Sequence, residues 1–112
     1  MGPREREAEK RIVAYRLKFS SRAVREVGEA YEWYEAQSQG LGSEYEAALE
    51  LQLRRLEQAP LLYTEVLPGI RRTLLPRFPY GVFYAVRGDL VHILAVIHNV
   101  RNPKRWPLGQ AR

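Results

Sequence analysis

The stretch YGVFYAVRGDLVHILAVIH, residues 80–98, determines the fold class of this 112-residue chain. It holds two apolar runs that join at Gly88–Asp89, and glycine followed by aspartate is a two-residue connection typical of a tight β-hairpin. A turn at these two residues sets Phe83 opposite Leu94. The stretch therefore predicts two neighbouring antiparallel strands.

This register divides the hairpin into two faces. The face expected to pack on helices carries Tyr80, Val82, Tyr84, Val86, Val91, Ile93, Ala95 and Ile97. The face expected to point outward carries Gly81, Phe83, Ala85, Arg87, His92, Leu94, Val96 and His98. Both histidines thus fall on the outer face. A slip of one residue in either strand would move its side chains to the opposite face.

The N-terminal half begins with a segment of alternating pattern. Residues 12–19, IVAYRLKF, alternate apolar and basic side chains and predict a half-buried strand. Apolar residues then recur at helical spacing over residues 20–37, and Ser20 or Ser21 is the expected N-cap. The remaining positions of this helix hold Glu26, Glu29, Glu32 and Glu35, so its outer face is expected to be acidic.

A second helix follows a glycine-containing turn at Gly40 and Gly42. The pattern Ser43-x-x-Glu46 predicts a capping box at its start, and Pro60 marks its end. Its apolar stripe contains Tyr45, Ala48, Leu49, Gln52, Leu53 and Leu56. The two helices are close enough in sequence to form an antiparallel helix hairpin.

The order of elements predicts an α+β domain. After a loop over residues 60–68, the sequence IRRTLL at 70–75 predicts one more strand before the hairpin. We expect an N-terminal strand and a two-helix hairpin packed on a twisted antiparallel β-sheet. Residues 12–112 are expected to form this single domain, and residues 1–11 a charged N-terminal extension.

Composition excludes several classes of protein. The chain has no cysteine, and hence neither a disulfide framework nor a thiolate metal site. No apolar run reaches the ~18–20 residues that a membrane span requires. The N-terminal sequence MGPREREAEKR is too charged for a signal peptide. We therefore expect a cytoplasmic protein that does not act on a membrane.

Positive charge is concentrated in the second half of the chain. The formal net charge is +5, yet residues 1–59 hold 10 lysines and arginines against 11 acids. Residues 60–112 hold 8 lysines and arginines against 2 acids. An acidic or phosphate-bearing partner is therefore expected to bind the second half.

Most familiar catalytic patterns are absent from the sequence. It has no glycine-rich phosphate loop and no H-E-x-x-H motif, and two histidines six residues apart are a weak metal signal. We expect neither a metal nor a cofactor. What remains is a group of cations and aromatic residues: Arg71, Arg72, Arg77, Phe83, His92, His98, Arg101, Lys104, Arg105 and Trp106. Such residues bind phosphates and stack on bases, or cleave RNA with histidine as acid or base. The alternative is structural, with Trp106 covering the sheet edge and the arginines paired with carboxylates.

Three motifs in order give the sequence a family resemblance. They are W-Y-E at residues 33–35 with G-L-G at 40–42, R-F-P-Y at 77–80, and H-x-x-R-x-P-x-x-W at 98–106. In this order and spacing the chain resembles the RelE/ParE superfamily of type II toxins, and is most similar to its ParE-like, plasmid-stabilisation branch. The resemblance covers residues 15–106 and implies the RelE/ParE-like fold.

The resemblance implies a toxin that is neutralised by a cognate antitoxin, usually an acidic protein that lays a helix and an extended segment on the toxin. RelE-like members cut mRNA in the ribosome, whereas characterised ParE members poison DNA gyrase. RelE-like ribonucleases carry an arginine where this chain has Gly81, and a tyrosine or histidine where it has Trp106. We therefore expect a gyrase poison that acts by binding rather than as an enzyme.

Two alternatives remain open under this resemblance. In a ribosome-dependent mRNA endoribonuclease, His98 and Arg101 would be the catalytic residues. A non-toxic member of the fold would only bind an antitoxin. For the surface that binds the target or the antitoxin, we expect Arg71, Arg77, Phe83, His92, Arg101, Lys104, Arg105 and Trp106. The sequence is compatible with a homodimer but does not require one.

Overall fold

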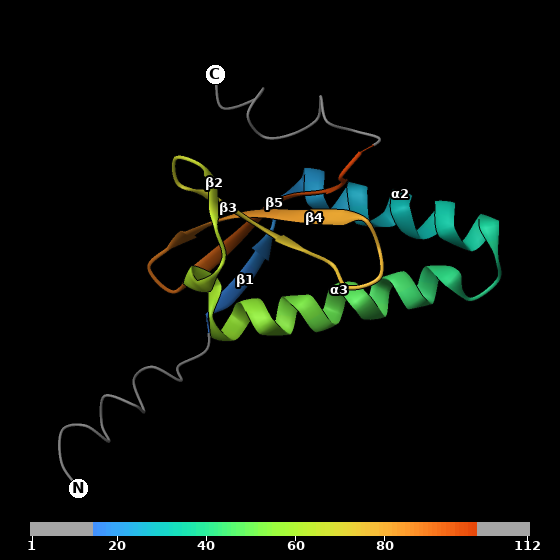
Figure 1. Ribbon diagram of the computed structural model, residues 1–112, viewed down its shortest axis with the longest axis horizontal. Helices are drawn as coiled ribbons and strands as arrows, with labels where there is room; N and C mark the ends of the chain where they lie inside the picture. The colour runs from blue at the N-terminus through green and yellow to red at the C-terminus, as the bar shows by residue number, and fades with distance from the viewer. Residues whose placement is uncertain (1–14, 101–112) are drawn as a thin grey trace, which may run out of the picture.

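The computed structural model describes residues 15–100 as two helices on one face of a five-stranded sheet (Figure 1). The elements in chain order are β1 (Arg16–Phe19), α2 (Ser21–Gln37), α3 (Leu41–Gln58), the 3₁₀ turn η1 (Pro60–Leu62), β2 (Glu65–Leu67), β3 (Ile70–Leu74), β4 (Tyr80–Arg87) and β5 (Leu90–His98). The sheet order is β1-β5-β4-β3-β2, with β1 parallel to β5 and every other pair antiparallel. This arrangement confirms the predicted α+β fold.

The ends of the chain extend beyond the described residues. The predicted first strand began at Ile12, and its described part is β1. The expected extension at residues 1–11 lies outside the described range. Within that range β2 is a short strand that the sequence pattern did not indicate, because residues 60–68 read as a loop.

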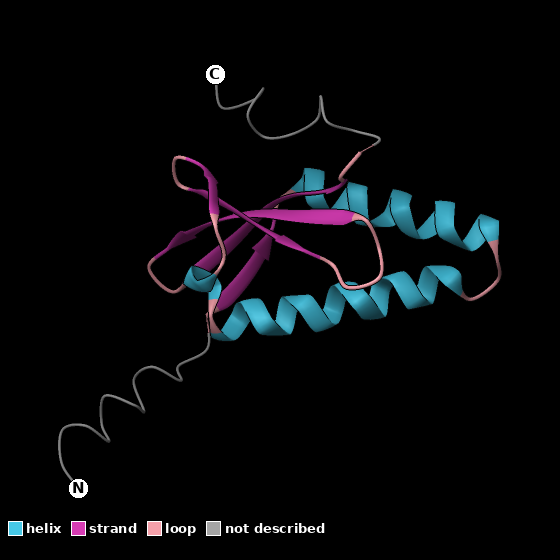
Figure 2. Cartoon of the chain, in the orientation of Figure 1, coloured by secondary structure: helices cyan, strands magenta, loops and turns pink. Residues whose placement is uncertain are grey.

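Hydrogen bonds between one carboxylate and two glycine N–H groups fix the turn of the helix hairpin. Ser20 caps α2 as predicted, with its Oγ accepting from the Ala23 N–H at 3.0 Å. The capping box predicted at Ser43 is wrong, because α3 begins at Leu41 and its N-cap is Gly40, in the left-handed region with φ 89°. The Glu35 carboxylate of α2 accepts instead from the N–H groups of Gly40 and Gly42, at 2.8 and 2.9 Å. The preceding helix therefore caps the following one, and Figure 2 shows the short turn that joins the two helices.

The β4–β5 register differs from the predicted one. The strands pair as expected near the turn, but beyond Tyr84 and Ile93 the register shifts, and Phe83 lies opposite Ala95. Leu94 is the extra residue of a β-bulge, which the alternating pattern does not reveal. As a result Ala95 lies with Phe83 on the outer face, and the residues after it change faces too.

The core is aromatic where the helices meet the sheet. Tyr34, Tyr45, Phe78 and Tyr80 form a cluster of stacked and edge-to-face rings with centroids 4.9–6.0 Å apart. A second, smaller cluster lies on the outer face, where Val66 and Ile70 of the β2–β3 hairpin pack on the cluster of Phe83, Ala95 and Ile97. The β2–β3 hairpin therefore buries part of the face that was expected to point outward.

Candidate functional site

The bulge separates the two histidines. His92 lies opposite Ala85 on the outer face, as predicted. His98 lies opposite Tyr80 on the helix-facing side, with the two ring centroids 5.3 Å apart. The prediction that both share one face is wrong for His98, because the extra residue at Leu94 inverts the side-chain alternation that follows it.

The predicted arginines that the structure describes do not converge. Arg71 lies in β3 and donates to the carbonyl oxygens of Leu61, within η1, and of Tyr63, which follows η1. Arg77 follows β3 in the left-handed region (φ 70°) and forms an exposed ion pair with Glu44 at 2.9 Å. The remaining predicted residues lie outside the described range: Arg101, Lys104, Arg105 and Trp106. The predicted surface is therefore divided among several regions.

Arg72 occupies the outer face beside Gly81. It pairs with Phe83 across β3 and β4, and its guanidinium carbon lies 6.0 Å from the centroid of that ring. A Cβ added to Gly81 would meet the Arg72 side chain at 3.2 Å and the Asn99 amide oxygen at 3.1 Å. Gly81 is thus covered by the side chain of an arginine from the neighbouring strand.

The tyrosines near the core are held in their neutral form. Tyr84 is fully buried, its hydroxyl donates to the Pro60 carbonyl at 2.6 Å, and burial raises the pKa of Tyr84 to about 12. Burial also raises the pKa of Tyr45, whose hydroxyl has no hydrogen-bond partner in the described part of the chain. Both hydroxyls remain protonated at neutral pH, so neither acts as a general base there.

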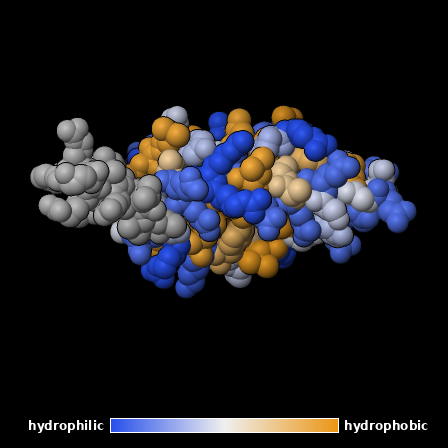
Figure 3. Space-filling view, turned by 90° about the horizontal axis from the view of Figure 1, so that it is seen from below, coloured by the Kyte–Doolittle hydropathy of each residue, from blue (hydrophilic) through white to orange (hydrophobic). Residues whose placement is uncertain are grey.

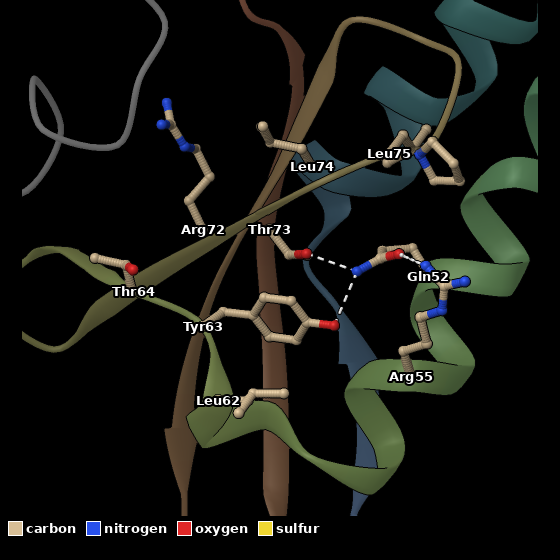
Figure 4. Close-up of a pocket in the computed structure, with 10 residues that line it drawn as sticks. Gln52, Arg55, Leu62, Tyr63, Thr64, Arg72, Thr73, Leu74 and Leu75 are labelled. Atoms are coloured by element: carbon tan, nitrogen blue, oxygen red, sulfur yellow. Dashed lines mark hydrogen bonds between the residues drawn. The ribbon is translucent and has the colours of Figure 1, made fainter.

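A shallow groove of about 450 Å³ opens along the edge of β3. It is lined by Gln52, Arg55, Leu62, Tyr63, Thr64, Arg72, Thr73, Leu74, Leu75 and Pro76 (Figure 4). Two arginines and no acid stand among these lining residues. Leu62 and Leu74 are 77% and 51% exposed, which makes the walls of the groove apolar and accessible. Apolar patches also break the hydrophilic surface when the molecule is viewed from below (Figure 3).

The groove exists because β2 covers only part of β3. The last backbone hydrogen bond on that side runs from Arg72 N–H to Thr64 carbonyl oxygen at 3.1 Å. Leu75 N–H donates toward β4, to Tyr80, so by strand alternation the Leu74 N–H points the other way, toward the groove. The described residues place no further strand beside Leu74. We call the stretch of β3 from Arg72 to Leu74, with its groove, the open edge.

Gln52 forms the floor of the open edge. Its side chain is buried, and its amide nitrogen donates to Thr73 Oγ1 at 2.7 Å and to the Tyr63 hydroxyl at 3.2 Å. Its amide oxygen accepts from Arg55 at 3.0 Å. Both N–H groups of the amide are therefore engaged, and Gln52 has no donor left for an incoming group.

The opposite side of the sheet is closed by side chains of α2. Beyond the end of β1, the Glu26 carboxylate accepts from the Val96 N–H at 2.8 Å, and Ser20 Oγ donates to the Leu94 carbonyl at 3.0 Å. Glu26 is only 4% exposed and pairs with Arg22 at 2.8 Å. We call this stretch of β5, Leu94 to Val96, the closed edge.

The prediction that Glu26 lies on the exposed face of α2 is wrong, because its side chain is buried. A signal for its burial was present: Glu26 lies three residues after Ala23 and four before Ala30, both in the apolar stripe. A glutamate within such a stripe needs a buried partner. That partner, a backbone N–H of β5, is 70 residues away in sequence.

Neither a metal centre nor a membrane span is found in the part of the chain that the structure describes. Residues 15–100 contain no group of three or more histidines, cysteines, aspartates or glutamates placed to hold a metal ion. Within the same range no helix is long and apolar enough to cross a membrane.

A helix hairpin packed on this five-stranded sheet is the fold of the RelE/ParE toxin superfamily, and comparison with known proteins specifies the family. The family described as "ParE toxin of type II toxin-antitoxin system, parDE" matches residues 17–103. Because this match covers most of the chain, the chain belongs to the ParE toxin family of type II toxin–antitoxin systems.

Two solved structures share the fold of this chain. A structure of the chromosomal ParDE system from P. aeruginosa covers 76% of this chain and 96% of its own, with a TM-score of 0.68 and 20% sequence identity. The E. coli toxin RelE, solved in mutant form in complex with a peptide of the antitoxin RelBc, covers 88% of this chain and 95% of its own. Its TM-score is 0.57 and its identity 21%. No curated protein sequence matches the chain.

Proposed function

We propose that this toxin arrests growth by binding DNA gyrase and that a cognate antitoxin neutralises it in the cytoplasm. The observation that carries the choice of target is the surrounding of Gly81. An arginine there, as in RelE-like ribonucleases, would have to displace the Arg72 side chain, which a bare Cβ already meets at 3.2 Å. These surroundings of Gly81 support contact with a partner over cleavage of RNA.

The tyrosines support the same choice. Acid–base cleavage of RNA needs a group that exchanges protons near neutral pH. The buried Tyr84 hydroxyl stays protonated and donates its hydrogen bond to the Pro60 carbonyl. Binding to a protein target needs no such group, and the asymmetric positive charge of the second half of the chain favours an acidic partner.

An antitoxin partner is supported by the relatives. The two solved structures are a ParDE toxin–antitoxin system and a complex of RelE with an antitoxin peptide. By family membership we extend such a partner to this chain. We expect the gene to lie beside a short reading frame whose acidic product binds and neutralises the toxin.

Induction of the toxin in cells separates the two mechanisms. A gyrase poison is expected to cause filamentation and an SOS response, and the purified chain is expected to inhibit supercoiling or to trap gyrase on cleaved DNA. Rapid loss of translation with codon-positioned cuts in ribosome-bound mRNA would instead show a ribonuclease. Absence of any growth effect, together with tight antitoxin binding, would show a non-toxic member of the fold.

The two histidines provide a matched pair of variants for this experiment. A ribonuclease that uses His98 would lose its cuts in His98→Ala and keep them in His92→Ala. For a gyrase poison we expect both variants to remain toxic, provided that circular dichroism shows them folded. Loss of toxicity in the folded His98→Ala variant alone, accompanied by loss of mRNA cuts, would contradict the gyrase proposal.

A further inference from the structure

We propose that η1 is the anchor through which the toxin docks on its protein target, with Leu61 and Leu62 entering an apolar pocket of that partner and Arg55 pairing with a carboxylate at its rim. The naming of the target as gyrase rests on the function proposed above. Three observations support the inference: the gathering of exposed leucines, the fixed backbone beneath them, and the distribution of charge on α3.

Exposed leucines gather around η1. Leu61 and Leu62 are 57% and 77% exposed, although apolar side chains of this size are usually buried. The described residues hold two more exposed leucines, Leu51 and Leu74. Leu74 lines the same groove as Leu62 and Arg55, and Leu51 lies one helical turn before Arg55 on α3. A single exposed leucine carries no meaning, but a shared apolar patch marks a site of interaction.

The backbone of η1 is fixed from inside the protein. The hydroxyl of the buried Tyr84 donates to the Pro60 carbonyl at 2.6 Å. Arg71 of β3 donates to the carbonyl oxygens of Leu61 and Tyr63. These bonds hold the whole turn, while its two leucine side chains remain in solvent. An anchor whose backbone is ordered before binding loses less conformational entropy when a partner arrives.

The groove beside η1 does not bury these leucines. Figure 4 shows Tyr63 turned toward Gln52, whose amide donates to the tyrosine hydroxyl at 3.2 Å and to Thr73 at 2.7 Å. These bonded groups fill the floor of the groove, and Leu62 lies at its lower end in this view. The chain therefore supplies a fixed turn and leaves the contact with its leucines to another molecule.

The two flanks of α3 differ in charge. On the flank toward η1, Arg55 lines the groove and donates to the Gln52 amide oxygen at 3.0 Å. It takes part in none of the ion pairs among the described residues. On the flank toward α2, Glu46 and Glu50 line a separate groove with an apolar floor. A partner of η1 is therefore expected to carry a carboxylate close to its apolar pocket, where it can pair with Arg55.

The shape of the anchor favours a folded protein as the partner. Two leucines that project from a turn need a concave apolar pocket, and such pockets occur on folded proteins. A nucleic acid fits less well, because proteins bind it mainly through phosphates and base edges rather than through aliphatic side chains. An isolated helix or strand of an antitoxin offers no pocket of this kind. We therefore assign η1 to the target.

A second copy of the chain is the remaining candidate. Its groove beside Glu46 and Glu50 has an acidic rim and a volume of about 260 Å³. Two copies that each carry a net charge of +5 repel one another, however. The contact would also be head-to-tail, which leaves one anchor unfilled unless a ring closes. A folded target is therefore the better fit.

The test uses the full chain and purified bacterial DNA gyrase. The dissociation constant is measured by surface plasmon resonance, and inhibition of supercoiling is measured in parallel. The double variant Leu61→Asp/Leu62→Asp charges the anchor, whereas Val24→Asp makes the same change at a residue of α2 that is 59% exposed. Arg55→Glu reverses the charge beside η1, whereas Arg54→Glu reverses its exposed neighbour, which does not line the groove. Circular dichroism and urea midpoints establish that each variant is folded.

We expect the double variant to weaken binding about thirtyfold or more, because apolar anchors that become buried carry most of the energy of an interface. Leu62→Ala is expected to weaken binding about fivefold, and Val24→Asp less than about twofold. Arg55→Glu is expected to weaken it about tenfold, and Arg54→Glu less than about threefold. The concentration that inhibits supercoiling is expected to rise in the same order.

Several outcomes would overturn the inference. Unchanged gyrase binding by the folded double variant would do so and leave the gyrase proposal intact. Equal losses in the double variant and in Val24→Asp would do the same, and equal losses in Arg55→Glu and Arg54→Glu would remove the role assigned to Arg55. Sedimentation that shows self-association of the wild-type chain, lost in both the double variant and Glu50→Arg, would assign η1 to a second copy.

Growth arrest in cells distinguishes a failure of the gyrase proposal from a failure of this inference. A wild-type chain that arrests growth without binding gyrase contradicts the gyrase proposal alone. Arrest that is then lost in the double variant and kept in Val24→Asp would support η1 as the anchor for a different protein target. Arrest by both variants would overturn the anchor, and a wild-type chain that neither binds gyrase nor arrests growth would contradict both proposals.

Discussion

The two edges of the sheet differ in how helix side chains cover their backbone groups. At the closed edge the buried Glu26 of α2 accepts a hydrogen bond from the Val96 N–H of β5, and the Ser20 hydroxyl donates to the Leu94 carbonyl. At the open edge α3 contributes Gln52, which bonds only side chains and leaves the backbone of β3 accessible. Two helices of one hairpin thus protect one edge and expose the other.

The difference shows that an open edge is not a necessary result of the fold. A buried carboxylate is costly unless it is fully hydrogen-bonded, and Glu26 is bonded to both Val96 and Arg22. The chain therefore has a means of covering a strand within this architecture. Among the described residues, no side chain from a helix covers the backbone of β3 at Leu74 in this way.

Replacement of one residue by proline at each edge tests this comparison, and it has the largest expected effect. Val96→Pro removes an N–H that the buried Glu26 needs, and we expect it to lower the free energy of unfolding by about 4 kcal/mol or more. Leu74→Pro removes an N–H that faces the groove, and we expect a loss of less than about 1 kcal/mol. Urea denaturation of both variants measures the difference, and equal losses would contradict the assignment of open and closed edges.

Replacement of the carboxylate itself is expected to have the next largest effect. Glu26→Ala leaves the Val96 N–H buried without an acceptor, which we expect to cost about 3 kcal/mol. Glu26→Gln keeps an oxygen near that N–H and is expected to cost about 1 kcal/mol. Chemical denaturation gives both values, and Glu29→Ala on the exposed face of α2 serves as the control with little expected change.

Alanine substitutions at two glycines test how closely the two helices pack. A Cβ at Gly42 would meet the Glu35 carboxylate and the Tyr31 carbonyl oxygen at 2.8 Å, so Gly42→Ala is expected to destabilise by about 2 kcal/mol. Gly28 lies within α2 with nothing inside 4 Å of its Cβ position. Gly28→Ala is therefore expected to stabilise by about 0.5–1 kcal/mol. Thermal unfolding distinguishes them, and a stabilising Gly42→Ala would show that the hairpin is looser than described.

The smallest expected effect concerns the support of the open edge. The Tyr84 hydroxyl holds Pro60 at the start of η1, whose last residue, Leu62, lines the groove. Its pKa is about 12 in the folded chain against 10.0 for the free group. The unfolded chain therefore releases this proton first, and folding stability falls as pH rises from about 10 toward 12. Tyr84→Phe is expected to cost about 1 kcal/mol at neutral pH and to flatten this alkaline decline in urea midpoints.

Local pattern predicted much of the fold from particular residues. Gly88–Asp89 correctly marked the hairpin turn, and the stripe from Tyr45 to Leu56 correctly marked the buried side of α3. Such features depend on neighbours within a turn or two of the chain. The motifs at residues 33–35 and 40–42 were also detectable, but their physical reason, the capping of α3 by Glu35, became clear only in three dimensions.

Less of the candidate site than of the fold could be predicted from the sequence. The bulge at Leu94 moved His98 to the helix-facing side, and Arg71 was found bonded to backbone carbonyls beside η1. The open edge had no sequence signal of its own, because it arises from the length of β2 relative to β3. A strand's length depends on where its partner diverges, which is a property of the assembled sheet.

By itself, then, the sequence of this ParE-family toxin determined the α+β class, the order of its elements and the stripes that form the core. These follow from side-chain periodicity and turn chemistry, which act over a few residues. Tertiary structure alone decided the faces beyond the bulge, the burial of Glu26 and the exposure of the β3 edge. Each of those depends on hydrogen bonds between residues far apart in the chain, and these form only when the helix hairpin meets the sheet.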